Sequence, residues 1–244
     1  MKHMLVLSLC GGLLAFPTLA TADNAKNGVY LSGKLGASVM QLSEQKYVYS
    51  GYADAGDNGT KNGASHRSAV FGGGIALGYN FNPLFDIPVR AELDITARGD
   101  MENTYNIQNR VRNGVSQTRD IKNQVKLNTV MVNGYYDFYN TTAFTPYLTA
   151  GIGLAYVDLK TTRTDTRNGT ITQNPSHTHT SNNFAWSVGA GVDYALNDKV
   201  NLGLSYRYLD AGRAEMTNSA GDGNNTSKVN VKSNDIMLGV TYQF

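Results

Sequence analysis

Residues 88–98 read Pro-Val-Arg-Ala-Glu-Leu-Asp-Ile-Thr-Ala-Arg, and this stretch decides the fold class. Every second residue from Val89 to Ala97 is apolar, and every second residue from Arg90 to Arg98 is charged or threonine. This period of two predicts a β-strand, because successive side chains of a strand point to opposite faces. One face of this strand is apolar and the other is strongly polar.

The same alternation recurs along the chain, and no stretch keeps a sustained helical periodicity. The polar faces are rich in small residues, such as Ser187, Gly189 and Gly191. Small side chains suit a crowded interior better than a solvated surface. The sequence therefore predicts an all-β fold, an eight-stranded antiparallel transmembrane β-barrel of the outer-membrane type. We expect its strands at residues 28–40, 68–81, 88–98, 125–138, 144–158, 183–196, 200–210 and 234–244.

The connections between these strands alternate in length. Three are tight, at residues 82–87, 139–143 and 197–199. Four are long and polar, at about residues 41–67, 99–124, 159–182 and 211–233. Short turns on one side and long loops on the other are typical of outer-membrane barrels. We expect the loops to be extracellular and, because the strand number is even, both termini to be periplasmic.

The composition agrees with a barrel wall. The 244 residues are 41% hydrophobic but only 16% charged, against roughly 25% charged residues in soluble domains. The mean hydropathy of −0.32 argues against a helical membrane protein but not against a barrel, whose strands alternate apolar and polar residues. The net charge of +2 implies no strongly acidic or basic partner.

The first residues predict an export signal. The apolar stretch Met4–Phe16 is followed by the small-residue pattern Ala20-Thr21-Ala22. This predicts a secretory signal peptide over residues 1–22, with cleavage after Ala20 as the alternative. Residues 23–244 then form a single barrel domain. The only cysteine, Cys10, leaves with the signal peptide, so we expect no disulfide in the mature chain.

Aromatic residues gather at the strand ends, which predicts two belts at the membrane interfaces. Those near the short turns are Tyr79, Phe81, Phe85, Tyr136, Phe138, Phe144, Tyr194, Tyr242 and Phe244. Those near the long loops are Tyr156, Phe184, Trp186, Tyr206 and Tyr208.

Several strands and turns carry a resemblance to a known family. The matching stretches are Pro88–Leu93, Asn133–Phe138, Thr145–Leu148, Gly189–Tyr194 and Leu204–Leu209. On these residues the chain resembles the opacity (Opa) family of outer-membrane adhesins, within the wider group of barrels similar to the transmembrane part of OmpA. The long loops match no member of that family. The resemblance implies host-receptor binding through the loops, without identifying the receptor.

The last residues, Tyr242-Gln243-Phe244, resemble the C-terminal aromatic signal of outer-membrane proteins. This resemblance implies recognition of Tyr242 and Phe244 by the outer-membrane insertion machinery.

The inward faces of the predicted strands carry charged residues of both signs. They are Lys34, Arg90, Glu92, Asp94, Arg98, Asp137, Asp193 and Arg207. Unpaired charges in a narrow lumen are costly, and an eight-stranded barrel is just wide enough for side chains to fill. We therefore expect a structural network of ion pairs that plugs the lumen. The alternatives are an acid–base pair formed by Glu92 and Asp94, or a narrow pore.

The sequence gives little support to an enzyme. The histidines after the signal peptide are His66, His177 and His179, all expected in long loops. Barrel hydrolases need histidine beside serine or aspartate, and no known hydrolase or phosphate-loop motif occurs. His177 and His179 alternate as metal ligands do, but two ligands do not make a site. We expect no enzymatic activity, no metal and no cofactor.

The second long loop carries a basic cluster formed by Arg110, Arg112, Arg119, Lys122 and Lys126. Such a cluster is able to bind a sulfated, heparan sulfate-like glycan through charge-assisted hydrogen bonds. The Opa resemblance adds weight, because that family includes binders of heparan sulfate proteoglycans. The alternatives are contact with lipopolysaccharide phosphates and simple solvation. The predicted location disfavours nucleic acid.

Three tyrosines in the first long loop, Tyr47, Tyr49 and Tyr52, are interpreted first as the top of an aromatic belt and second as anchors of a protein interface.

The sequence as a whole predicts a bacterial outer-membrane surface protein, an adhesin or invasin that binds host receptors or sulfated glycans through its loops. Its other expected partners are outer-membrane lipid and lipopolysaccharide. The alternative is a structural barrel or small porin without a dedicated ligand.

Overall fold

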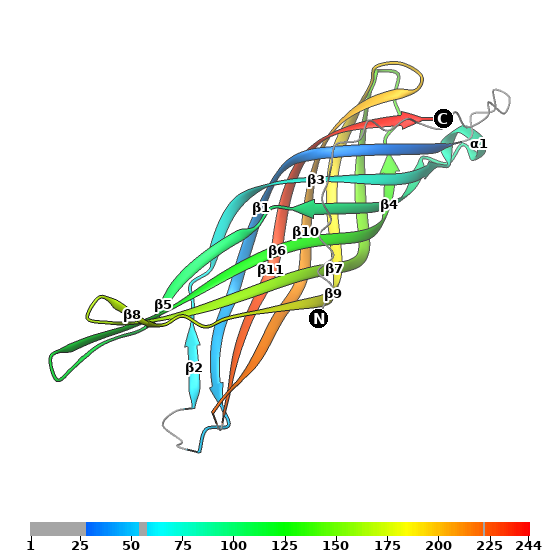
Figure 1. Ribbon diagram of the computed structural model, residues 1–244. Helices are drawn as coiled ribbons and strands as arrows, with labels where there is room; N and C mark the ends of the chain where they lie inside the picture. Colours follow the sequence, from blue (N-terminus) through cyan, green and yellow to red (C-terminus); the bar gives the residue numbers. More distant parts are fainter. Residues whose placement is uncertain (1–27, 54–57, 222) are drawn as a thin grey trace, which may run out of the picture.

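The computed structural model describes residues 28–53, 58–221 and 223–244, so the predicted signal peptide lies outside the described residues. The described part forms one antiparallel sheet and one short helix (Figure 1). The elements are β1 (Val29–Ser50), β2 (Gly59–Asn62), β3 (His66–Asn80), α1 (Asn82–Phe85), β4 (Val89–Arg98), β5 (Met101–Arg112), β6 (Val115–Asp137), β7 (Phe144–Arg167), β8 (Thr170–Gln173), β9 (Ser176–Ala195), β10 (Val200–Ala220) and β11 (Gly223–Gln243). No helix among these residues has the length and apolar character needed to cross a membrane.

Eight of the strands close into a ring, which confirms the predicted barrel. The ring runs β1, β3, β4, β6, β7, β9, β10, β11, and β11 pairs again with β1. At the closure Leu35 lies opposite Leu238. In Figure 1, α1 and the C-terminus lie at one end of the ring, and the β5–β6 and β10–β11 hairpins extend from the other.

The part of the ring nearest α1 has the expected inside-out arrangement. We call it the barrel section: residues 29–40, 70–80, 89–98, 128–137, 144–156, 184–195, 200–210 and 233–243. Its outward side chains are apolar and exposed, with Ile75 62% and Leu238 61% exposed. Its inward side chains include the fully buried Asp94 and Asp235. Lipid would cover the outer face, because exposed apolar patches of this extent are rare on soluble proteins.

Exposed aromatic side chains lie at both ends of this apolar surface. Those toward α1 are Phe85, Tyr136, Phe138, Phe144, Tyr194, Tyr242 and Phe244. Those toward the hairpins are Tyr156, Phe184, Trp186 and Tyr206. This placement is typical of membrane-interface belts.

The segments expected to be long loops are mostly folded as strands. The predicted loops at 41–67, 99–124, 159–182 and 211–233 continue the strands of the ring, add β2, β5 and β8, and bring β6 and β7 to 23 and 24 residues. The expectation of irregular loops is therefore wrong for most of their described residues. We call these extensions the projecting section: residues 41–53, 58–67, 101–127, 157–183, 211–221 and 223–232.

Two tight turns explain how the extensions fold. Asn113 and Gly114 both have positive φ, at 50° and 72°, and they join β5 to β6. Asn168 and Gly169 do the same between β7 and β8, at 48° and 79°. Two consecutive positive φ angles define the type I′ turn, for which Asn-Gly is the preferred sequence. Both Asn-Gly dipeptides predict hairpins. This signal was overlooked when the segments were assigned as loops.

The ring does not continue through the projecting section. The pairing of β9 with β10 ends at Trp186 and Asp210, and β5 pairs with β6 alone. The extensions therefore form two sheets, one from β5, β6, β7, β8 and β9 and one from β2, β1, β11 and β10. Figure 1 shows these two groups of strands separating beyond the ring.

The two sheets enclose an apolar core, which inverts the arrangement of the barrel section. Between the sheets lie buried apolar residues such as Leu42, Leu127 and Leu159, and outside lie Lys126 and Lys160. The core continues into the top of the barrel section and comprises Met40, Leu42, Met101, Val125, Leu127, Met131, Ala155, Val157, Leu159, Ala185, Leu209, Ala211, Ala214, Met216, Val229 and Val231. The interior of the barrel section is therefore mainly polar, whereas that of the projecting section is mainly apolar and also holds buried polar residues such as Gln45 and Asn123.

Candidate functional site

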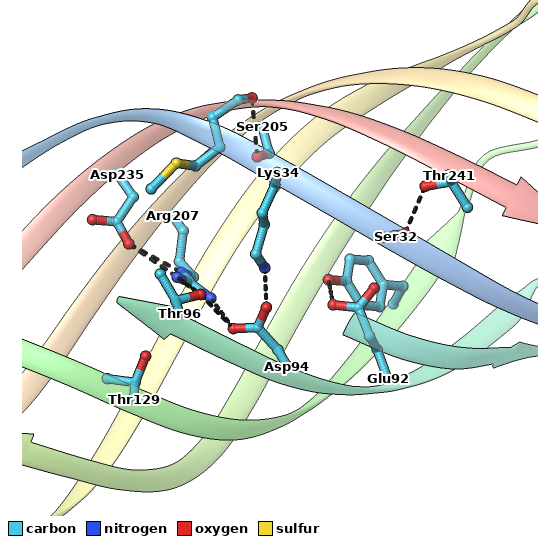
Figure 2. A network of polar contacts seen from close by, with 12 residues as sticks. Ser32, Lys34, Glu92, Asp94, Thr96, Thr129, Ser205, Arg207, Asp235 and Thr241 are labelled. Carbon is cyan, nitrogen blue, oxygen red and sulfur yellow. Dashed lines mark hydrogen bonds and ion pairs between the residues drawn. The ribbon is translucent and has the colours of Figure 1, made fainter. Parts of the chain in front are cut away.

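The inner face of the barrel section holds two layers of charged side chains. The layer farther from α1 centres on Asp94 of β4, which forms an ion pair with Lys34 of β1 (Figure 2). Arg207 of β10 also contacts Asp94, with Nη1 3.0 Å from Oδ1. Thr96 donates its hydroxyl to the same oxygen at 2.8 Å. Two cations and one hydroxyl therefore share one buried carboxylate.

A second carboxylate in this layer is Asp235 of β11. Its Oδ2 lies 2.6 Å from Nη2 of Arg98 and 3.1 Å from Nη2 of Arg207. Ser233 donates to its Oδ1 at 2.6 Å. The side chains of Arg98 and Asp235 are wholly inaccessible to solvent. Figure 2 shows Arg207 between Asp94 and Asp235, so this arginine links β4 to β11 across the lumen.

The layer nearer α1 centres on Arg90. Its guanidinium lies 2.7 Å from Asp137 and 3.0 Å from Asp193. It also lies over the rings of Tyr135 and Tyr147, 4.8 and 5.0 Å from their centroids. Such cation–π contacts add to the ion pairs and hold the guanidinium in the plane of the layer.

Glu92 is held by hydroxyls rather than by a cation. Tyr30 donates to it at 3.2 Å and Tyr135 at 2.8 Å. The Tyr30 ring lies directly against Gly78, where any Cβ would overlap it. Glycine at this position therefore lets an aromatic ring lie flat against the barrel wall.

The structure thus places all eight of the predicted lumen residues inside the barrel section and gives each of them a polar partner. Arginines, tyrosines and carboxylates fill the lumen and leave a cavity of about 70 Å³ among them. The carboxylates of Glu92 and Asp94 are both engaged by protein donors. This arrangement favours a structural plug over an acid–base pair or an open pore.

Sequence reasoning missed Asp235 and the three inward tyrosines, Tyr30, Tyr135 and Tyr147. The signal for Asp235 was present, because it lies in the strand expected at residues 234–244, on the same face as the small or polar residues Gly239 and Thr241. The partners could not be found in this way, because alternation gives the face of a residue but not the register between distant strands.

The predicted basic cluster is divided between two faces of its hairpin. Arg110 and Arg119 lie on the same face of the hairpin. Arg110 is opposite Gln117, and Arg119 is opposite Gln108. Lys122 and Lys126 lie on the other face, which points away from the apolar core. The five cations therefore do not form one patch.

Some of these cations already have partners. Arg119 forms a two-pronged ion pair with Asp165 of β7, at 2.6 and 3.0 Å. Lys122 lies 2.7 Å from Glu102. Arg110 donates to Gln117 at 2.9 Å, while the exposed Arg112 flanks the Asn-Gly turn. The pKa of Arg119 is raised, mainly by its hydrogen bond to Asp165.

The histidines lie in strands, which corrects their expected loop location. His66 begins β3, and His177 and His179 lie in β9 opposite Thr161 and Leu159. The described residues contain no group of three or more His, Cys, Asp or Glu side chains arranged to hold a metal ion.

The structure places the residues of two aromatic predictions in different sections. Tyr47 is 7% exposed and belongs to the inner face of the projecting section, so its interpretation as part of a lipid-facing belt is wrong. Tyr242 and Phe244 are 42% and 44% exposed, with their rings edge to face 5.2 Å apart. They lie at the α1 end of the barrel section.

Comparisons with known proteins agree with this architecture. The sequence profile of the family described as "Outer membrane protein beta-barrel domain" matches residues 8–244. The outer membrane protein PagN of Salmonella typhimurium is 38% identical over 248 residues, covering 100% of both chains. A candidate adhesin of Rickettsia canadensis is 24% identical, covering 89% of this chain and 88% of its own. The crystal structure of Neisserial surface protein A has a TM-score of 0.49 at 19% identity, covering 89% of this chain and 97% of that one.

Proposed function

The chain belongs to the outer membrane protein β-barrel domain family, and we propose that it is a surface adhesin or invasin that binds host-cell receptors or sulfated glycans through its projecting section. As a member of this family it is a bacterial outer-membrane protein. The names of related proteins, among them candidate adhesins of Rickettsia, support the adhesive role.

One observation carries the proposal. The strands continue far beyond the apolar belt and build a second folded unit, with its own core and a polar outer surface. A structural barrel needs no such unit, because its ring is already closed and paired charges lie in its lumen. Rigid strands that present a polar surface away from the membrane suit the binding of a partner. We place the projecting section outside the cell, which puts both termini in the periplasm.

The exposed arginines of the β5–β6 hairpin form the proposed contact with sulfated glycan. Arg110 and Arg112 lie at its tip and present their guanidinium groups to solvent. Arginine binds sulfate by paired hydrogen bonds, so two neighbouring arginines suit a sulfated chain. Arg119 contributes less in this proposal, because Asp165 already neutralises it.

The outward lysines have a different proposed partner. Lys126 and Lys160 lie on the outer face just beyond the belt residue Tyr156. At this height the phosphate groups of lipopolysaccharide surround an outer-membrane barrel. We assign these lysines to lipopolysaccharide and Tyr242 and Phe244 to the insertion machinery. The opacity-family resemblance likewise remains part of the proposal.

The test is to display the chain on a bacterium that does not adhere to host cells. Attachment should appear, and soluble heparin should reduce it. Surface expression is checked with an antibody in the same cells. Absence of attachment with normal surface expression would overturn the proposal and favour a structural barrel without a dedicated ligand.

A matched pair of double variants locates the contact. Changing Arg110 and Arg112 to Ala should reduce heparin-sensitive attachment about tenfold, which corresponds to about 1.4 kcal/mol. Changing Lys122 and Lys126 to Ala removes the same charge from the opposite face and should leave attachment unchanged. Equal losses from the two variants would contradict the assignment to the arginine face.

A further inference from the structure

A cavity of about 190 Å³ lies between the two sheets of the projecting section. We call it the inter-sheet cavity. Its polar lining comes from five strands or their ends and includes Tyr47, Arg163, His177, Asn218, Asn225 and Ser227. None of these residues belongs to the lumen network or to the basic cluster of the β5–β6 hairpin.

On one side of the inter-sheet cavity, strands β9 and β10 are no longer paired, because their pairing ends at Trp186 and Asp210. Here Nδ2 of Asn218 on β10 lies 3.1 Å from Nε2 of His177 on β9, so side chains rather than backbone pairs join the two strands. Met216, a member of the apolar core, contributes to the lining. The cavity therefore has mainly polar walls, and one of its sides is formed by side chains alone.

Two buried polar atoms of the lining lack hydrogen-bond partners within the described residues. They are Nε of Arg163 and Oγ of Ser227, on opposite sheets. Ser227 is 1% exposed. Folded proteins rarely leave buried polar groups unsatisfied, and ordered water is a common partner for those that the chain itself does not satisfy. Both residues belong to the cavity lining, so the lining has polar capacity on both sheets that the described residues do not use.

The charge around Arg163 indicates the sign of a group that would bind in the cavity. Its Nη2 donates to Gln173 at 2.8 Å and lies 3.5 Å from Asp165. Asp165 is already bound by Arg119 at 2.6 Å. Two guanidinium groups thus share one carboxylate, which leaves one uncompensated positive charge at the cavity. An anionic group is the complement.

The remaining lining indicates hydroxyl groups. Asn218, Asn225 and Ser227 offer both donors and acceptors, which hydroxyls match because they also do both. Tyr47 adds an aromatic ring. The volume corresponds to about six waters at roughly 30 Å³ each, which is the scale of one sugar ring rather than of a peptide segment.

We propose that the inter-sheet cavity binds one acidic sugar residue of an extracellular glycan. Its carboxylate or sulfate is held by Arg163 and its ring hydroxyls by Asn218, Asn225 and Ser227. This proposal rests on the proposed function, because it requires the projecting section to face the outside of the cell. It adds a subsite that reads a single sugar, separate from the arginines of the β5–β6 hairpin.

The experiment titrates the purified chain in lipid nanodiscs by calorimetry with four probes: glucuronate, glucose 6-sulfate, glucose and acetate. Glucuronate or glucose 6-sulfate should bind at least tenfold more tightly than both glucose and acetate. The stronger of the two tells whether carboxylate or sulfate is preferred. Equal binding of all four probes, or binding of none, would overturn the proposal.

Variants place the binding in the cavity. Arg163→Gln should weaken the acidic sugar at least tenfold. Arg167→Gln is the matched control, because Arg167 lies four residues further along β7 on the same face and is exposed. It should bind as the parent does. Where Arg163→Gln reduces folding, shown by altered heat-modifiable gel mobility, Ser227→Ala serves instead and should weaken binding several-fold. Unchanged binding in the folded cavity variant would refute the site.

The outcomes separate this site from the adhesive function. Acidic-sugar binding without attachment to cells would overturn the proposed function and leave the site standing. Attachment to cells without acidic-sugar binding would overturn the proposed site and leave the proposed function standing.

Discussion

The barrel section and the projecting section share most of their strands, but the barrel section is apolar outside and polar inside, while the projecting section is polar outside and mainly apolar inside. In the barrel section Leu238 points outward and Asp235 inward. Further along the same strand Val231 points inward and Lys232 outward. Strand β11 keeps its alternation of faces throughout, so the inversion comes from the sequence and not from a twist in the strand. The alternation of a β-strand therefore does not show by itself which face meets lipid. The positions of its polar residues are also needed.

Two bulges accompany the change from one section to the other. In β1 the register shifts between Ser43 and Lys46, where Glu44 has a φ of 50°. In β10 it shifts between Asp210 and Arg213. Bulges bend a strand and increase its local twist. They lie close to the level at which the ring divides into two sheets.

The largest expected effect tests the buried network of the barrel section. Asp235→Ala leaves Arg98 without its buried carboxylate, and removing one partner of a buried ion pair costs about 3–5 kcal/mol. We expect the free energy of unfolding in urea, measured in lipid vesicles, to fall by that amount. Glu215→Ala, which removes an exposed ion pair with Lys228 on the projecting section, should cost about 0–1 kcal/mol. Similar losses would contradict the contrast between the two sections.

The apolar core of the projecting section gives the next effect. Leu159 is fully buried, so Leu159→Ala should cost about 2–5 kcal/mol of local stability. Hydrogen exchange along β7 should accelerate around Val157 and Leu159, while the heat-modifiable gel mobility of the barrel stays unchanged. Lys160→Ala, at the exposed neighbouring position, should be neutral. Loss of barrel mobility in Leu159→Ala would mean that the two sections unfold as one unit.

Ionisation of Tyr105 at high pH should destabilise the projecting section. Burial in the projecting section raises the pKa of Tyr105 to about 12. Because the folded pKa lies above the unfolded one, the neutral phenol stabilises the fold below about pH 10, and this contribution is lost as the pH rises toward 12. Hydrogen exchange of β5 and β6 should therefore accelerate in this range. Tyr105→Phe should remove part of the dependence, and an identical pH profile in that variant would refute the assignment.

Alternation was sufficient to predict the strands of the ring and the inward charges, because both depend on which face a residue occupies. It was insufficient for Asp235 as the partner of Arg98, since that pairing depends on the register between β4 and β11. The projecting section was missed for a different reason. Its inward residues, such as Leu42 and Leu159, are buried between two sheets rather than by lipid, so its polar outer face resembled that of a solvated loop. The division of the basic cluster follows from the same oversight, because only a strand sends Arg119 and Lys122 to opposite faces.

The smallest expected effect concerns the turn that makes the β5–β6 hairpin. Gly114 has a φ of 72°, and a Cβ at this position meets no other atom within 4 Å. Gly114→Ala therefore acts through the backbone alone, and a left-handed conformation costs an L-residue about 1–2 kcal/mol. We expect faster hydrogen exchange near Arg112 and Val115 and unchanged urea stability of the barrel section. Gly59→Ala is the matched control, because Gly59 is equally open but lacks a positive φ. If Gly114→Ala left exchange unchanged while Gly59→Ala accelerated it in β2, the turn would not determine the hairpin, and the projecting section would depend on its core alone.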